Sequence, residues 1–203
     1  MSEVPFRFRA ASGPWLAGTV IALAVACVVD LAVEGGVMLA LRWGPTAALA
    51  AVGAWAVFWS PQIAVHDDGP HLRNILRTWV VPWAAIQRID TKYSLTLVTP
   101  GRKITSFAAP APGRLTARRA VRSDVDHLPE STYGPGRSVR PGDLPAGPSG
   151  QIAIVLRERW EARRDADDLD GPSPTPTAVW HRGIAATLGV LAVAAAAAAA
   201  LIR

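Results

Sequence analysis

Three uncharged apolar stretches constrain this chain more than any motif in it. They run from Ala10 to Val29, from Gly44 to Ile63 and from Gly183 to Ile202. Each is about 20 residues long, which is the length that an α-helix needs to cross the hydrocarbon core of a bilayer. The sequence therefore predicts three transmembrane helices in a multi-pass protein of the cell membrane, with a soluble part between the second and third stretches.

Basic residues beside these stretches predict the orientation of the protein. Arg7 and Arg9 precede the first stretch, and Arg182 precedes the third. Because positively charged flanks are retained in the cytoplasm, the N-terminus and the soluble part are both expected there. The first two stretches then form a hairpin. Its turn can lie at 34–36 or at 42–45, since both segments contain residues that break helices.

The segment after the second stretch changes from helical to extended periodicity. Ile63 and Val65 alternate with polar neighbours, residues 67–70 supply a turn, and residues 72–81 can pair back as a second strand. Further strands are expected at 86–93, 95–99 and 103–107. Residues 100–101 are Pro-Gly, which fits the centre of a type II turn. This pattern predicts a small antiparallel sheet and, with the helices, an α+β fold.

A helix is expected to close this sheet. Its apolar residues recur at helical spacing: Ile152, Val155, Leu156 and Trp160. Charged residues such as Arg163 cover the other face, and Ser149 is positioned to cap the helix. We therefore expect Trp160 to anchor the helix on the sheet rather than to contact a ligand.

The residues between the sheet and this helix differ in composition. Residues 123–150 contain five prolines and several glycines and show no apolar periodicity. A segment with so little apolar surface to bury does not gain enough from folding to offset its conformational entropy. It is predicted to be a disordered insertion that the domain does not need for folding.

Several short segments of the β region resemble a known family. They are Trp59-Ser60-Pro61, Asp68-Gly69, Arg73 to Thr78, Val81 to Ile86, Tyr93 to Leu97 and Ala108 to Arg114. With them the chain resembles the PH domain-containing membrane proteins of actinobacteria and is similar to the low molecular weight protein antigen 6 PH domain. The resemblance implies a PH-like antiparallel sheet closed by a C-terminal helix. The residues to which it assigns structural roles are Pro61, Asn74, Arg77, Pro82, Trp83, Ile86, Leu95, Leu97, Pro110, Pro112 and Gly113.

Together, these patterns predict six parts along the chain. They are a transmembrane hairpin at 1–59, a PH-like β domain at 60–122, the disordered insertion at 123–150, a capping helix at 151–170, a linker at 171–182 and a third transmembrane helix at 183–203.

The basic charge of the chain is concentrated in the β domain. The net charge is +5, and residues 60–126 hold ten Arg and Lys against five Asp. Each positive charge near an anionic bilayer contributes about 1 kcal/mol, so the expected counter-ion is membrane lipid rather than nucleic acid. The candidate contacts to anionic lipid or to a partner are Arg114, Arg118, Arg119 and Arg122. A solvated basic run is the alternative.

Two aspartates argue against one kind of lipid site. Eukaryotic PH domains that bind phosphoinositides use a basic loop between their first two strands. The corresponding turn in this chain contains Asp67 and Asp68, which would repel phosphates. A phosphoinositide pocket at this turn is therefore not expected.

No pattern in the sequence predicts catalysis, a metal site or a cofactor. His66 and His71 flank the two aspartates, but no second ligand pair follows at a recognised metal-site spacing. The sequence contains no glycine-rich phosphate loop after a strand, and no Ser, His and Asp set in a nucleophile context. The single cysteine, Cys27, cannot form an intrachain disulfide.

The expected function is that of a non-enzymatic scaffold or adaptor for another membrane or envelope protein. The alternative is a small accessory subunit of a transporter, because Asp30 and Glu34 lie on one helix face near the first span, with Arg42 available as a partner. The sequence leaves the identity of the partner and the oligomeric state open.

Overall fold

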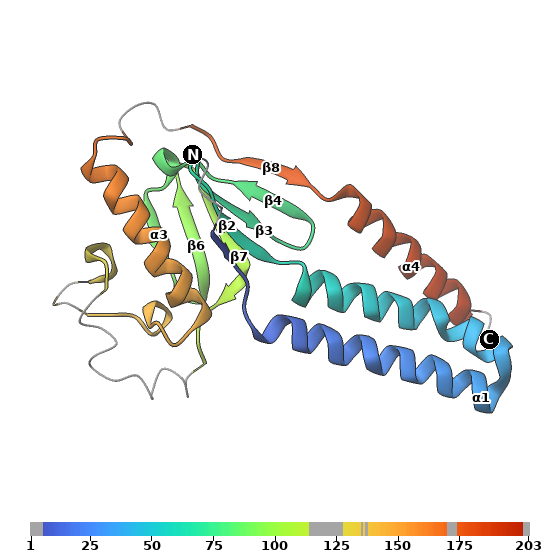
Figure 1. Cartoon of the computed structure of the whole chain (residues 1–203). Coiled ribbons are helices and arrows are strands. Elements are labelled where there is room, and N and C mark those ends of the chain that lie inside the picture. Colours follow the sequence, from blue (N-terminus) through green and yellow to red (C-terminus); the bar gives the residue numbers. More distant parts are fainter. Residues whose placement is uncertain (1–5, 114–127, 135, 137, 170–173, 201–203) are drawn as a thin grey trace. The chain divides into compact units, whose positions relative to one another are not determined.

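The computed structural model describes residues 6–113, 128–134, 136, 138–169 and 174–200 (Figure 1). The chain divides into two compact units. One unit combines Met1–Ala10 with Gln62–Val179 and contains the sheets. The other combines Ala11–Pro61 with Trp180–Arg203 and contains the long apolar helices. We call them the sheet unit and the helical unit.

The first sheet of the sheet unit has five short strands. They are β1 (Phe6–Phe8), β2 (Gln62–Val65), β3 (Pro70–Arg73), β4 (Arg77–Val80) and β8 (Thr177–Trp180), in the order β1-β2-β3-β4-β8. The pairs from β1 to β4 are antiparallel. The single strand predicted at 72–81 is wrong, because the chain reverses after β3 and the backbone N–H of Asn74 donates to Arg77 O at 2.9 Å. Strands β1 and β8 lie in segments where no strand was predicted.

The second sheet follows the prediction more closely. It contains β5 (Arg88–Asp90), β6 (Ser94–Thr99) and β7 (Arg102–Pro110), all antiparallel. The turn between β6 and β7 has a φ of 72° at Gly101, as the predicted type II turn requires. A short 3-10 helix, η2 (Trp83–Ala85), leads from the first sheet into β5.

The predicted covering helix is present as α3 (Pro148–Asp165) and packs against β6 and β7. Ile152, Ala153 and Leu156 are fully buried in a core that also contains Ile63, Leu72, Leu95 and Leu97 from both sheets. Trp160 packs against the edge of this core. Ser149 does not cap the helix, because its hydroxyl donates to the carbonyl O of Gly142 at 2.6 Å.

The predicted disorder of residues 123–150 is wrong for the part that the structure describes. Residues 123–127, 135 and 137 lie outside the described residues. The rest include the 3-10 helices η4 (Glu130–Thr132) and η6 (Pro141–Asp143) and the first turn of α3. Thr132 and Asp143 are buried in these elements. The segment is thus held by buried polar side chains, which leave no apolar periodicity in the sequence.

The helical unit contains α1 (Ser12–Ala54), its π-helical continuation η1 (Trp55–Trp59) and α4 (Arg182–Ala200). Within the described residues, two helices are long and apolar enough to cross a membrane, Ser12–Trp59 and Arg182–Ala200, and not the predicted three. The alanine-rich α4 packs against α1, as its small side chains allow. The α+β class with antiparallel sheets is confirmed, and the number of apolar helices is corrected.

The first of these two apolar segments, Ser12–Trp59, consists of two helical arms joined at a non-helical residue. Phe8, just before α1, pairs with Ile63, just after η1, so the chain must return to its starting point. It reverses at Gly36, whose φ of 78° and ψ of 167° lie outside the helical region and are accessible to glycine. The arms 12–35 and 37–59 lie side by side (Figure 1). Residues of both arms, such as Val28 and Ala47, line the same shallow grooves. Pro45 lies inside the second arm.

Candidate functional site

The residues singled out by the family resemblance are mostly packing residues of the sheet unit. Those buried in its core are Trp83, Ile86, Leu95 and Leu97. Pro112 lies against Gly147, just before α3. Pro61 ends the first segment of the helical unit, Pro82 directly precedes η2, Pro110 ends β7 and Gly113 follows it. The predicted basic contacts Arg114, Arg118, Arg119 and Arg122 lie outside the described residues.

Asn74 joins the two sheets. Its side chain is 6% exposed, its amide Nδ2 donates to Thr105 O at 2.8 Å, and its Oδ1 accepts from the backbone N–H of Phe107 at 3.0 Å. The amide therefore pairs with the outer edge of β7 as a neighbouring strand would. The turn between β3 and β4 is held in place by these two bonds.

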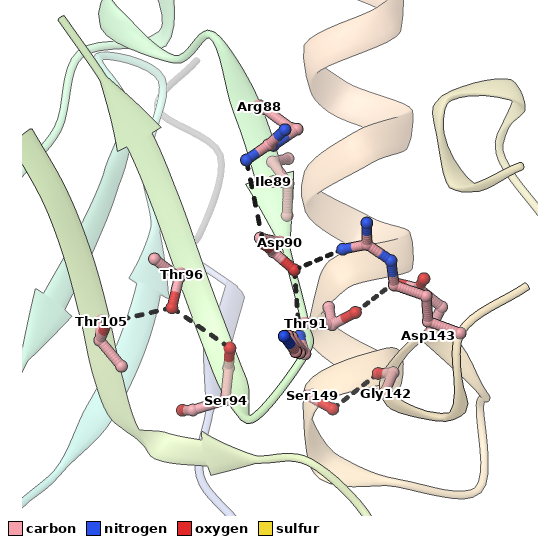
Figure 2. A network of polar contacts seen from close by, with 12 residues as sticks. Arg88, Ile89, Asp90, Thr91, Ser94, Thr96, Thr105, Gly142, Asp143 and Ser149 are labelled. Atoms are coloured by element: carbon pink, nitrogen blue, oxygen red, sulfur yellow. Dashed lines mark hydrogen bonds and ion pairs between the residues drawn. The ribbon is translucent and has the colours of Figure 1, made fainter. Parts of the chain in front are cut away.

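A buried ion pair attaches α3 to the edge of the second sheet. Arg157 of α3 and Asp143 of η6 form a 2.7 Å contact, with side chains 4% and 3% exposed. Asp143 also accepts from the Thr91 hydroxyl at 2.6 Å, as Figure 2 shows. The other guanidinium bonds of Arg157 go to Thr132 Oγ1 at 3.2 Å and to Ile89 O at 3.0 Å. Each member of this pair compensates the buried charge of the other. We call the pair of Arg157 and Asp143 the buried lock.

Close backbone approach makes the buried lock possible. A Cβ atom added to Gly142 would lie 1.9 Å from Thr91 O, so only glycine allows η6 to meet the end of β5. Beside this contact, Arg140 Nη1 lies 2.8 Å from Asp90 Oδ1, and the backbone N–H of Lys92 donates to the same oxygen at 3.1 Å (Figure 2). The residues around η6 thereby cover the edge of β5 that does not pair with another strand of its sheet.

The pKa of Asp90 reflects these contacts. Burial alone would raise it, but the backbone N–H of Lys92, the Arg140 guanidinium, the backbone N–H of Thr91 and the charge of Arg88 together hold the pKa below its ordinary value. Asp90 is therefore held in its charged form by groups of the second sheet and of the segment that covers it.

The sequence did not predict the buried lock, although it contained a signal. Arg157 lies four residues after Ala153 and three before Trp160, so it belongs to the apolar face of the helix. A lone arginine on an apolar face requires a buried acidic partner. Asp143 could not be identified as that partner, because it lies in a segment without periodicity.

A polar groove lies at the far end of α3. It has a volume of about 500 Å³ and is lined by Asp67 of the turn between β2 and β3 and, from α3 and the turn after it, by Arg159, Ala162, Arg163, Ala166 and Asp168. Its two aspartates and two arginines give it charges of both signs. We call it the polar groove.

Trp83 supports one wall of the polar groove. The guanidinium of Arg163 lies 5.4 Å from the Trp83 ring centroid, and Arg163 Nη1 contacts Asp168 at 3.2 Å. The indole Nε1–H donates to His66 O at 3.2 Å, which ties the turn after β2 to the same ring. Arg163, which was expected on the charged face of the helix, is thus partly exposed and lies over the Trp83 ring.

The two histidines near the aspartates lie in the same turn. The rings of His66 and His71 are 4.2 Å apart, and His71 Nε2 lies 3.3 Å from Asp68 Oδ2. The two histidines and Asp68 thus form a polar cluster at the turn of a hairpin. The turn carries the acidic side chains Asp67 and Asp68, with no arginine or lysine between β2 and β3.

The charged residues of the helical unit are not brought together as expected. Asp30 and Glu34 are exposed on α1, shortly before the reversal at Gly36. In the part of the chain that the structure describes, no ion pair joins either of them to Arg42.

Comparison with protein families supports the resemblance to a PH domain in the β region of the chain. The model of a bacterial PH domain family matches residues 60–131, which include β2 to β7. No curated protein and no solved structure matches the chain. The matched range ends before α3, although α3 completes the core of the same unit.

Proposed function

We propose that this bacterial PH domain protein is anchored in the cell membrane by its apolar helices and acts as a non-enzymatic scaffold or adaptor. Its sheet unit faces the cytoplasm and binds another membrane or envelope protein at the polar groove. Arg7, Arg9 and Arg182 beside the apolar helices support the cytoplasmic side. We also propose that the protein belongs with the PH domain-containing membrane proteins of actinobacteria, whose motifs it resembles.

The observation that carries the proposal is how the sheet unit is attached. Phe8 pairs with Ile63, and residues 9–11 and 60–61 alone connect this end of the sheet to α1 and η1. On the other side, His181 alone separates β8 from α4. All three connections between the sheet unit and the apolar helices are therefore short, so the sheet unit is tethered to the helices at three points of the chain.

The polar groove belongs to the opposite end of the same sheet. From Ile63, β2 runs away from the connections to the turn at 66–69, and Asp67 of that turn lines the groove. Pockets for small ligands are mostly apolar and enclosed, whereas this groove is polar and open. Charges of both signs favour a protein segment that carries complementary charges, because such pairs set the orientation of a partner.

Site-specific photocrosslinking tests the proposal. A benzoylphenylalanine at position 162 lines the polar groove, whereas one at Gln151 is exposed at the start of α3 and serves as the control. We expect a discrete crosslinked protein in native membranes from position 162 but not from position 151. Arg159→Glu should abolish that product, because it reverses a charge of the groove. Equal products from both positions, or a product unaffected by Arg159→Glu, would contradict the proposal.

The same assay distinguishes the accessory-subunit alternative. Asp30→Asn combined with Glu34→Gln changes the helical unit only, so a scaffold should keep its crosslinked partner. Loss of the product would favour a role in which these two carboxylates matter.

A further inference from the structure

The turn between β3 and β4 lies at the end of the sheet from which the chain continues into α1. Gln62, the first residue of β2, pairs with Arg73, the last residue of β3, and Arg73 pairs with Thr78. The side chain of Arg9 donates to Gln62 Oε1 at 3.3 Å in the same place. Residues 74–76 therefore lie next to the connections, at the opposite end from Asp67 and Asp68 (Figure 1).

Positive charge gathers around this turn. Arg73 and Arg77 flank it directly, and the guanidinium carbons of Arg77 and Arg102 lie 4.8 and 4.9 Å from the centroid of the Trp79 ring. Strands β1 to β4, β6 and β7, as the structure describes them, contain no aspartate or glutamate. The acidic side chains of the hairpin are confined to its other end. The sheet is thus polarised, with its basic end beside the helical connections.

Apolar side chains are exposed among these arginines. Leu76 at the tip of the turn is 38% exposed, and Phe107 on the adjoining strand β7 is 64% exposed. The two bonds from Asn74 to β7 hold the turn beside Phe107. Arginine beside exposed leucine and phenylalanine is the combination by which amphipathic helices bind the interfacial region of a membrane, and this turn presents the same side chains.

We propose that this surface, which consists of Arg9, Arg73, Leu76, Arg77, Arg102 and Phe107, rests on anionic phospholipid headgroups of the membrane that holds α1 and α4. The arginines contact the phosphates, and Leu76 enters the boundary between headgroups and acyl chains. The contact shares with the proposed function the premise that the apolar helices are in the membrane, but it requires no protein partner.

Lipid quenching of a fluorescent label in nanodiscs tests the contact. The full chain with Cys27→Ala and Leu76→Cys, labelled with an environment-sensitive fluorophore, is reconstituted with brominated phosphatidylcholine, with or without 30% phosphatidylglycerol. Asp68→Cys in the same background labels the opposite turn of the sheet as the matched control. Wild-type protein labelled at Cys27 of α1 reports whether the helix is inserted.

We expect strong quenching at position 76 in discs that contain phosphatidylglycerol, weak quenching without it, and none at position 68. Arg73→Gln and Arg102→Gln should each weaken docking of the turn about fivefold, since one charge near an anionic surface is lost. Arg77→Lys keeps the charge and should retain docking. Thermal melting of each variant separates loss of docking from loss of folding.

Two results would overturn the inference. They are equal quenching at position 76 in both kinds of disc, and no quenching in either kind while Cys27 is quenched. Absence of quenching at Cys27 would instead refute membrane insertion, on which the proposed function also depends. Failure of the crosslinking experiment leaves the lipid contact unaffected.

Discussion

Replacing Asp143 by alanine should destabilise the sheet unit strongly, because it leaves the Arg157 charge buried without its acidic partner. Removing one member of a buried ion pair costs about 3 to 5 kcal/mol. Arg157 would keep its bonds to Ile89 O and to Thr132, so we expect the lower end of this range, about 3 kcal/mol. For a domain of this size each kcal/mol lowers the melting temperature by about 3 to 5 °C, which predicts a decrease of roughly 10 °C.

The assay is a double-mutant cycle on the detergent-solubilised full chain. For each variant, the thermal unfolding of the sheet unit is measured. The double variant Asp143→Ala with Arg157→Met removes both charges and should recover most of the loss, because apolar replacement of a buried pair is often close to neutral. Asp165→Asn is the matched control, since it removes an aspartate from an exposed pair with Arg164, and such pairs contribute at most about 1 kcal/mol.

Two outcomes would refute the reasoning about the buried lock. One is an effect of Asp143→Ala as small as that of Asp165→Asn. The other is a double variant no more stable than Asp143→Ala alone. Either would mean that the segment before α3 does not supply the counter-charge for Arg157.

Two further predictions concern the edges of the sheets. Asp90→Asn should lower stability at pH 7, and the difference from wild type should shrink as the pH falls below about 4. The lowered pKa of Asp90 contributes its full stabilisation where the carboxylate is charged in both the folded and unfolded states, and this contribution is lost as the pH falls through the folded-state pKa. Urea unfolding across this pH range measures the difference, and a difference that grows in acid would contradict the prediction. Asn74→Ala should cost about 1 to 3 kcal/mol, because it leaves Thr105 O and the Phe107 N–H without their partner. Amide exchange at Phe107 should then accelerate more than at Leu97 in the core, and equal acceleration would indicate global rather than local loosening.

Much of the sheet unit could be predicted from local patterns. Strands β6 and β7 and the turn between them follow from alternation of apolar residues and from Pro100-Gly101, which act within a few residues of each other. The apolar face of α3 was identified because Ile152 and Leu156 repeat with the period of a helix. The apolar helices were also visible, whereas the reversal of the chain at Gly36 was left open between two possible turns, because both segments contain residues that break helices.

The candidate interaction surfaces were less accessible to prediction. The polar groove combines Asp67 with residues of α3 and the turn after it, almost a hundred residues later, and nothing local to either segment indicates that they meet. The basic surface around the turn at 74–76 was hidden by the prediction of one long strand. Its position beside the chain connections follows only from the register of β2 and β3.

Sequence alone established the class of this protein, because membrane-length apolar stretches and alternating strands are properties of consecutive residues. Only the tertiary structure decided that the proline-rich segment folds, that Arg157 is satisfied by Asp143, and that the sheet has a basic end and an acidic end. These features depend on pairs of residues far apart in the chain. A buried charge is tolerated only where a residue of opposite charge lies beside it. When that residue is distant in the sequence, no local pattern identifies it.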